Sequence, residues 1–386
     1  MKRKICFFTS TRADYGIMSR LMRKIEDSPE CELQIIATNM HLSPEYGLTY
    51  KEIESDGFNI NRKVEMMLSS DTRNGIVKSM GVGLLGFADA LEEMKPDIVV
   101  ILGDRYEMLA AAEACMIYNL PIAHIGGGDV TEGAFDDSIR HSITKLSYLH
   151  FASTDVARQR IIQMGEDPDR VFNFGGLGND NILNEPIMTK AELEESLGTK
   201  LDKDYIVVTF HPVTMENNTA EMQIRFLLKA LEDYLGSFKI IFTMPNSDAD
   251  SRVIADLIKS FVLKHPNESI AEVSLGKKRY YSALKYCSAV VGNSSSGIYE
   301  APSFHVPTLN IGDRQKGRLR GDSVVDVEAT QEGITKGLEK ALSKEFREYV
   351  KTTQSPFERP GTLDNMYDVL VRYPITDIKG KVFYSL

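Results

Sequence analysis

The chain has 386 residues, of which 42% are hydrophobic and 26% are charged, and its formal net charge is −10 at pH 7. This length exceeds one ordinary hydrophobic core and predicts two domains. Nucleic acid and anionic membranes both require a basic protein surface, so the acidic balance argues against them as partners. No apolar stretch has the length of a membrane span. The four scattered cysteines form no CxxC pair, which predicts reduced thiols and a cytoplasmic location.

Short apolar runs alternate with amphipathic stretches in the first half of the chain. The runs KICFFTS, LQIIATN, IVVILG, PIAHIG and LHFAS are typical of strands that are covered on both faces. Helices are predicted between them, at 17–27, 72–93, 106–118, 136–147 and 154–165. This alternation predicts a parallel sheet with helices on both of its faces.

Turn and breaker residues interrupt the pattern near 166–188. The alternation then resumes, with strands predicted in YIVVTFH, FKIIFTMP, SIAEVSL, SAVVGN and VPTLNIG. We therefore predict two α/β domains, 1–180 and 181–365, and a C-terminal segment, 366–386, that packs back on the first domain. Ligands of open parallel sheets bind beyond the carboxyl ends of the strands, so the polar motifs at those ends carry the candidate site residues.

Two polar motifs follow the early strands. In TSTRADYG, Arg12 stands at a helix start, where it can meet a phosphate or carboxylate; a capped helix with a surface arginine is the alternative. In GDRYE, Asp104 and Arg105 follow a buried strand, although an aspartate there can simply cap the next helix. The first motif lacks the GxGxxG spacing, which argues against a nicotinamide cofactor.

The block HIGGGDVTEGAFDDSIRH, residues 124–141, combines bare backbone with ionisable groups. Glycines let a ligand approach the main chain closely. Carboxylates gathered in a partly desolvated cleft acquire raised or split pKa values, which suit proton transfer. If Asp136 caps the following helix, Arg140 lies one turn further on. An acidic loop before an ordinary capped helix would give the same pattern, so this block alone does not decide the function.

The strongest motif of the second domain is GNSSSGIYEAPSFHVPTLNIGDRQKGR. Small side chains with free N–H and hydroxyl groups at a helix start form an anion cradle, which makes Ser294 and Ser295 candidate phosphate ligands. Glu300 can accept hydrogen bonds from ribose hydroxyls, and Arg314 follows the next strand. The spacing is not that of a P-loop, so a kinase or ATPase is disfavoured.

Six ordered blocks resemble the UDP-N-acetylglucosamine 2-epimerase family, most closely its hydrolysing branch, which feeds sialic-acid-type sugar synthesis: TRADYG, GDRYE, HIxGG…DDSIRHSITK, FHPVT, GNSSSGIYE and GDRQKGR. The resemblance implies two Rossmann-like domains of glycosyltransferase B type with the active site in the cleft between them. It also implies that UDP-N-acetylglucosamine and water give N-acetylmannosamine and UDP, through elimination to a 2-acetamidoglucal and hydration. It requires no metal or other cofactor, and it implies a homodimer or homotetramer.

Residue roles follow from the resemblance by motif position. Asp104 and Asp136 correspond to acid/base carboxylates, and Arg105 to a substrate contact. Arg12 and His211 correspond to groups near the diphosphate, and His211 is also counted as catalytic; from the residues alone, a hydrogen-bonded structural histidine is equally expected there. The other assignments are Asn246 to the sugar nucleotide, Ser294 and Ser295 to the phosphates, Glu300 to the ribose, Arg314 to the UDP end, and 274–282 to uracil.

One position departs from the family pattern. Many members have glutamate two residues after the histidine of this block, whereas this chain has Gly126. Glycine cannot transfer a proton. Asp129 is the nearest substitute in sequence and Glu132 is another, so the second acid/base group stays open between them.

The sequence alone leaves several alternative functions open. A relative acts on UDP-2,4-diacetamido-2,4,6-trideoxyglucose in the legionaminic acid pathway, and motifs that bind UDP do not distinguish the two sugars. A glycosyltransferase on the same scaffold would share the UDP cradle and require an acceptor. A non-hydrolysing epimerase would keep the sugar attached to UDP, and a UDP-sugar sensor would release no UDP.

Overall fold

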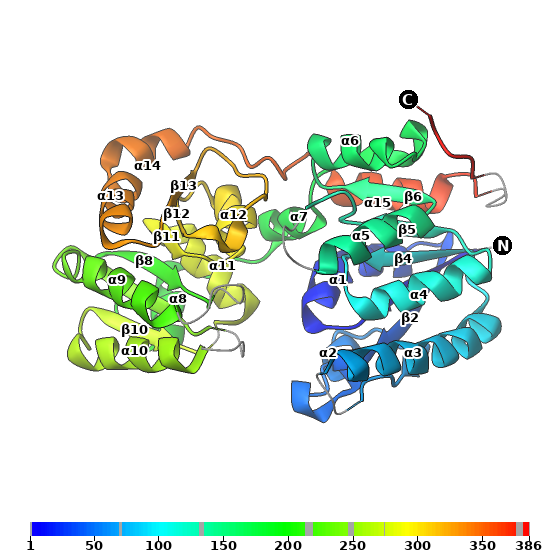
Figure 1. Ribbon diagram of the computed structural model, residues 1–386, viewed down its shortest axis with the longest axis horizontal. Coiled ribbons are helices and arrows are strands. Elements are labelled where there is room, and N and C mark those ends of the chain that lie inside the picture. Colours follow the sequence, from blue (N-terminus) through cyan, green and yellow to red (C-terminus); the bar gives the residue numbers. More distant parts are fainter. Residues whose placement is uncertain are drawn as a thin grey trace. The chain divides into compact units, whose positions relative to one another are not determined.

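The computed structural model describes residues 2–68, 72–130, 135–212, 219–245, 251–273, 275–375 and 381–385. The chain forms two compact units (Figure 1). The first unit comprises Met1–Asn181 and Phe357–Leu386, and the second comprises Ile182–Pro356. The chain thus returns to the first unit at Phe357, and the sequence-based boundary at 365 falls inside a helix of that unit.

The first unit is built on a parallel sheet. Its described strands have the order β3-β2-β1-β4-β5-β6-β7, and neighbouring strands pair in parallel. The strands are β1 (Arg3–Thr9), β2 (Cys31–Thr38), β3 (Arg62–Val64), β4 (Ile98–Leu102), β5 (Ile122–Ile125), β6 (Leu149–Ala152) and β7 (Val171–Asn173). The helices are α1 (Arg12–Glu26), α2 (Tyr50–Ser55), α3 (Arg73–Met94), α4 (Tyr106–Ile117), α5 (Phe135–Leu146), α6 (Asp155–Gln163), α7 (Leu177–Asn184), whose last three residues belong to the second unit, and α15 (Thr362–Arg372).

The second unit repeats this plan. Its described strands have the order β10-β9-β8-β11-β12-β13, again with parallel pairing. The strands are β8 (Asp204–Thr209), β9 (Phe238–Thr243), β10 (Ser269–Glu272), β11 (Ala289–Gly292), β12 (Thr308–Ile311) and β13 (Val324–Val327). The helices are α8 (Lys190–Leu197), α9 (Ala220–Glu232), α10 (Ser251–Lys264), α11 (Gly276–Tyr286), α12 (Ser296–Tyr299), α13 (Gln331–Leu342) and α14 (Lys344–Val350).

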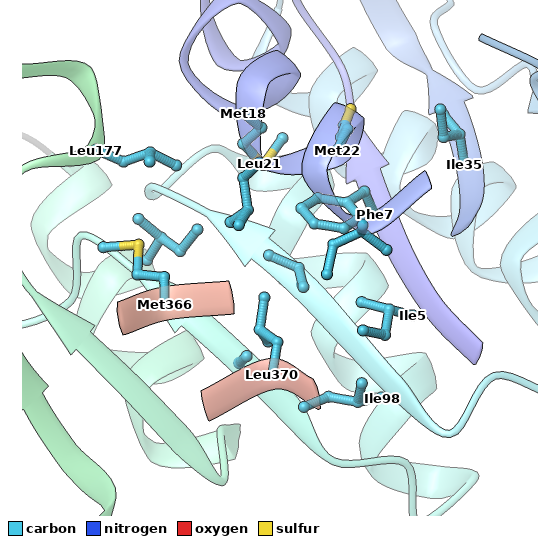
Figure 2. Close-up of a cluster of buried hydrophobic side chains, with 14 of the residues drawn as sticks. Ile5, Phe7, Met18, Leu21, Met22, Ile35, Ile98, Leu177, Met366 and Leu370 are labelled. Carbon is cyan, nitrogen blue, oxygen red and sulfur yellow. The ribbon is translucent and has the colours of Figure 1, made fainter. Parts of the chain in front are cut away.

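Helix α15 completes the core of the first unit. Figure 2 shows Met366 and Leu370 among the side chains of β1, β4 and α1, which include Ile5 and Leu21. All four side chains are fully buried. Burial of an apolar side chain of this size contributes about 2 kcal/mol, so packing alone explains why this distant part of the sequence stays on the first unit.

Both sheets reverse their strand order once, between β1 and β4 and between β8 and β11. In doubly wound sheets, ligands bind beyond the carboxyl ends of the strands at this point. Arg12 and Asp104 follow the two central strands of the first sheet, and His211 and Asn293 follow those of the second. The predicted fold class of two Rossmann-like α/β domains is confirmed, and its topology selects the same motifs as the sequence does.

Two further predictions concern the environment of the chain. The four cysteines are buried free thiols, as the scattered pattern predicts. In the part of the chain that the structure describes, no helix combines the length and apolar character needed to cross a bilayer.

Candidate active site

A buried arginine organises the polar groups at the carboxyl ends of β4 and β5. Arg140, on α5, is only 5% exposed. Its guanidinium forms an ion pair with Asp104 and a second one with Asp137, in which Nη1 lies 3.1 Å from Oδ1. It also donates a hydrogen bond to the carbonyl oxygen of Asp129 at 2.9 Å. Because a buried cation needs close carboxylates, Arg140 connects the loop after β4 to the residues that follow the glycine block, residues 126–128.

Asp104 is therefore not a helix cap. The N-cap of α4 is Arg105, and the carboxylate of Asp104 turns to Arg140 on another helix. The capping alternative for GDRYE is wrong at this position. Asp104 instead presents a partly exposed, ion-paired carboxylate beyond the end of β4.

Asp136 lies in the first turn of α5, which begins at Phe135. Asp136 thus lies inside the helix rather than before it as a cap, and Arg140 lies one turn further on. Burial and the negative charge of Asp104 raise the pKa of Asp136, against the opposing effect of Arg105 and Arg140. A carboxylate with a raised pKa is a stronger base, which suits it to accept a proton near neutral pH.

Arg105 is held by its own helix. Its Nε forms an ion pair with the fully buried carboxylate of Glu107. Burial lowers the pKa of Arg105, but the charge and the hydrogen bond of Glu107, together with other nearby acidic groups, raise it overall. Arg105 is therefore a fixed cation beside Asp136, consistent with the expected substrate contact.

The three glycines of the block differ in what surrounds them. A Cβ at Gly127 would lie 2.9 Å from both His124 Nδ1 and Thr144 Oγ1, and one at Gly128 would overlap the carbonyl of Ala157 on α6. Gly127 and Gly128 are thus required by packing. Gly126 has a φ of +82° and open space around its Cβ position. Only this glycine leaves room on its side-chain face, so the idea that all three provide bare backbone for a ligand is too broad.

Arg12 is exposed as the first residue of α1. The loop before it is fixed by the buried carboxylate of Asp14, which accepts hydrogen bonds from the amides of Ser10 and Thr11 at 3.0 Å each. Thr11 and Asp14 form a capping box. The capped-helix alternative for TSTRADYG is therefore correct, and it also displays Arg12 at the sheet edge.

In the second unit, His211 and Asn293 join the two central strand ends. The side-chain Oδ1 of Asn293 accepts a hydrogen bond from the amide of His211 at 2.7 Å, and its Nδ2 donates to the His211 carbonyl at 2.8 Å. Gly292 permits this approach, because a Cβ there would overlap the Thr209 carbonyl. His211 itself is 6% exposed, so its position is set by the fold.

The serine loop, residues 294–296, directly follows Asn293. Ser295 is the N-cap of the one-turn helix α12, and Ser294 and Ser295 are partly buried. A single turn carries little dipole, so an anion here would be held by backbone N–H and hydroxyl groups. The Ser296 hydroxyl donates to Glu300 and lies within hydrogen-bond distance of Tyr280. Burial raises the pKa of Glu300, although the hydrogen bonds from Ser296 and Tyr281 oppose this.

Arg314 and Gln315 close the other side of this loop. Arg314 Nη1 and Gln315 Nε2 donate to the carbonyl oxygen of Asn293, at 3.1 Å and 2.9 Å. The backbone of Asn293 is therefore bonded by residues that follow β12, and its side chain is bonded by His211, which follows β8. Arg314 lies beside the serine loop, as the assignment to the UDP end requires.

Three assignments of the sequence fall outside the described residues. Asn246, Glu132 and Ser274, the first residue of the segment assigned to uracil, belong to parts of the chain for which the structure gives no placement. Asp129 is described: its Oδ2 accepts a hydrogen bond from Ser153 at 3.3 Å, which places this carboxylate between β5 and β6.

The sequence assignments missed two organising residues. The sequence predicts for Arg140 only a place one turn beyond Asp136, and its i, i+3 spacing from Asp137 is the signal that marks it as an ion-pair partner. His124, in strand β5, lies fully buried with Nε2 2.8 Å from the Gly103 carbonyl. A histidine inside an otherwise apolar strand was the signal for a buried structural hydrogen bond.

Comparison with known proteins decides the family. The model of the UDP-N-acetylglucosamine 2-epimerase family matches residues 23–371. The chain belongs to the UDP-N-acetylglucosamine 2-epimerase family. It is 44% identical to GDP/UDP-N,N'-diacetylbacillosamine 2-epimerase (hydrolyzing) of Campylobacter jejuni, over 90% of this chain and 89% of that protein.

Two other relatives of the 2-epimerase family extend the comparison. The chain is 38% identical to polysialic acid biosynthesis protein P7 of Escherichia coli, over 100% of this chain and 98% of that protein. The crystal structure of Methanocaldococcus jannaschii UDP-GlcNAc 2-epimerase with UDP-GlcNAc and UDP superposes with a TM-score of 0.73 and 19% identity, covering 95% of this chain and 99% of that one. The sequence-based family assignment is thus confirmed, and the structural likeness supports the glycosyltransferase B type of fold.

Proposed function

We propose that this protein is a hydrolysing 2-epimerase that converts a UDP-linked 2-acetamido sugar and water to UDP and the free sugar inverted at C2. The carrying observation is the clustering of Asp104, Asp136 and Arg140 at the switch point of the first sheet. Abstraction of a weakly acidic C2 proton requires a carboxylate of raised basicity, and Asp136 has one. The serine loop of the second unit supplies donors for a diphosphate.

The proposed reaction has two steps. Asp136 removes the proton at C2, a C1–C2 double bond forms, and the C1–O bond breaks with its electron pair leaving on UDP. Water then adds its oxygen to C1 while a proton reaches C2 from the opposite face. Asp104 and Asp129 are the described carboxylates available for that second transfer, and Arg105 is the cation beside them. Ser294, Ser295 and Arg314 bind the diphosphate, Arg12 and His211 contact it, and Glu300 holds the ribose.

The preferred substrate is proposed to be UDP-N,N'-diacetylbacillosamine, which is the 2,4-diacetamido-2,4,6-trideoxyglucose nucleotide. The support is the 44% identity to the Campylobacter jejuni enzyme named for that sugar. UDP-N-acetylglucosamine is the second candidate, because the relative that matches the whole chain is named for polysialic acid biosynthesis. The two sugars differ at C4 and C6, away from the carbon whose configuration changes.

A UDP-release assay without any acceptor tests both parts of this proposal. We expect steady release of UDP from the diacetamido nucleotide, with a lower kcat/KM for UDP-N-acetylglucosamine. A reversed ratio would select the second substrate. Release only after an acceptor sugar is added would contradict hydrolysis and indicate a glycosyltransferase.

A further inference from the structure

The C-terminal segment 381–385 attaches to the carboxyl end of α5, the helix whose first turns carry Asp136 and Arg140. Lys381 Nζ donates hydrogen bonds to the carbonyl oxygens of Lys145 and Ser147, at 2.7 Å and 2.6 Å. Carbonyls at a helix end lack donors from a following turn, and a cation there interacts favourably with the helix dipole. The family model ends at residue 371, so this contact lies outside the region that defines the family.

A buried carboxylate holds Lys381 in place. Glu166, which is 1% exposed, pairs with Lys381 at 2.9 Å, with Lys145 at 2.6 Å and with His150 Nε2 at 3.0 Å. Burial raises the pKa of Glu166, but hydrogen bonds from His150, Lys145 and Lys381 outweigh it and lower the pKa to about 2. Glu166 is therefore an anion under all ordinary conditions, and it binds the end of α5 and the C-terminal segment together.

Backbone and aromatic contacts fix the rest of the segment. The amide of Tyr384 donates to the carbonyl oxygen of Gly165 at 2.9 Å, and Figure 1 shows the segment running beside α6. Gly165 has a φ of +86°, and a Cβ there would overlap the ring of Phe383. The ammonium of Lys145 lies 4.9 Å from the centre of the same ring. The segment is thus seated on a surface shaped to receive it.

Close polar contacts continue from this end of α5 to the candidate catalytic groups. The Thr144 hydroxyl lies 2.9 Å from the Arg140 carbonyl and 3.2 Å from His124 Nδ1, and its single hydrogen is donated to one of these two acceptors at a time. His124 Nε2 in turn lies 2.8 Å from the carbonyl of Gly103, the residue before Asp104. Burial lowers the pKa of His124 to about 3, so the ring is neutral and its Nε2 carries the hydrogen that faces this carbonyl. The carboxyl half of α5 is therefore linked, through Thr144 and His124, to the loop after β4 that carries Asp104.

We propose that Lys381 is a positioning residue for the epimerase reaction: it fixes the carboxyl end of α5 and so holds Asp136 and Arg140 in register with Asp104. This inference rests on the proposed function. Small displacements of reacting groups slow a chemical step strongly while leaving binding by remote groups intact. The expected signature is therefore a loss in kcat without a loss in nucleotide affinity, because, among the described residues, the groups proposed to bind the nucleotide do not contact Lys381.

The test replaces Lys381 in the full chain. Lys381→Met removes the ammonium and keeps the aliphatic stem, and we expect kcat for UDP release to fall about tenfold while KM and the Kd of UDP change less than about twofold. Hydrogen exchange should accelerate at the amides of residues 135–147 and stay unchanged in α1. Lys381→Arg retains a cation with several donors and should recover most of the kcat.

Lys24→Met is the matched control. Lys24 pairs with Asp364 on α15, so it also ties the C-terminal region to the first unit, but on α1 rather than α5. We expect its kcat to match the unmodified chain.

Three results would overturn the inference: an unchanged kcat in Lys381→Met, an equal loss in Lys24→Met, or a loss confined to KM. If Lys381→Met does not fold, Phe383→Ala loosens the segment while keeping every charge, and the same kcat and exchange changes are required of it. Failure of the unmodified chain to release UDP would instead contradict the proposed function, so the two failures are distinguishable.

Discussion

The two units share one strand order but place opposite chemistry at the ends of their central strands. The first unit brings ionised groups together there, with Asp104 and Asp137 paired to the buried Arg140 and Asp136 beside them. The second unit brings together amide and hydroxyl groups, in Asn293 and the serine loop. The same topology is thus proposed to support proton transfer in one unit and anion binding in the other, because a sheet fixes where a site lies and its loops fix what the site can do.

Stability follows the same division. In the first unit, each buried charge is compensated by opposite charges on neighbouring side chains. Removal of one partner therefore leaves an uncompensated buried charge. At the strand ends of the second unit, neutral hydrogen bonds dominate, and each contributes about 1 kcal/mol. Substitutions in the first unit are therefore expected to act on the reaction and the fold together, and those in the second unit mainly on nucleotide affinity.

The largest effect is expected from Asp136→Asn. The amide cannot accept the C2 proton, so kcat for UDP release should fall about 1,000-fold, while the Kd of UDP, measured by calorimetry, should stay within about twofold. Asp155→Asn, an exposed aspartate on α6 of the same unit, serves as the control. An unchanged turnover in Asp136→Asn would remove this residue from the reaction.

Arg140→Met tests whether the charges of the first unit behave as a group. The variant leaves Asp104 and Asp137 without their shared cation, and the free energy of unfolding of the first unit should drop by on the order of 3 kcal/mol. Denaturation followed by hydrogen exchange of β4 and α5 measures this loss. Equal destabilisation of β8 and β11 would show that the two units do not respond separately.

Acid should weaken the first unit through Glu166. Its pKa of about 2 lies below the ordinary glutamate value, so it contributes stability at pH values above about 4.5, and this contribution disappears as pH falls toward 2. The loss should be on the order of 2 kcal/mol after solvent screening is allowed for. Glu166→Gln should flatten the pH dependence of unfolding between these values, whereas Glu195→Gln, at an exposed position of the second unit, should not. A steep acid transition in Glu166→Gln would assign the effect to other groups.

A smaller and purely binding effect is expected from the serine loop. Ser294→Ala removes one hydroxyl from the proposed diphosphate cradle and should weaken UDP binding about tenfold, the equivalent of one hydrogen bond to a charged group. The kcat of the remaining activity at saturating substrate should change little. A kcat loss with unchanged UDP affinity would contradict the proposed separation of roles between the two units.

The glycine block gives the smallest expected effect and an internal control. Gly126→Ala places a side chain in open space at a positive φ and should cost about 1 kcal/mol of stability. Gly128→Ala has the same strain plus an overlap with Ala157 on α6, so its unfolding temperature should fall further. Equal losses in both variants would show that backbone strain alone governs the block.

Much of the fold was predictable because long apolar strands and amphipathic helices alternate. Strands such as β1 and β8 were recognised from their unbroken apolar runs, and fold class and family are confirmed. The short strands β3, β7 and β13 were missed, since each has only three or four residues and a polar or irregular pattern. Glycine and proline residues surround β7, so the sequence there predicts turns and not a strand.

The site was predictable as a set of motifs but not as a set of contacts. The pairing of Asp104 with Arg140 joins residues 36 positions apart, and nothing local indicates that the carboxylate turns away from its own helix. The link between Lys381 and α5 is more distant still, because it joins residues more than 230 positions apart. Contacts of this kind depend on how the helices pack on the sheet, and the local pattern of apolar and polar residues does not specify that packing.

Proton NMR of the reaction in deuterated water tests the central claim most directly, with UDP-N,N'-diacetylbacillosamine and UDP-N-acetylglucosamine as the two substrates. If carboxylates of the first unit exchange the hydrogen at C2 while the second unit releases the diphosphate, the products are UDP and a free C2-inverted sugar that carries deuterium at C2. A free sugar that retains its original hydrogen at C2, or a deuterated sugar still attached to UDP, would contradict this account.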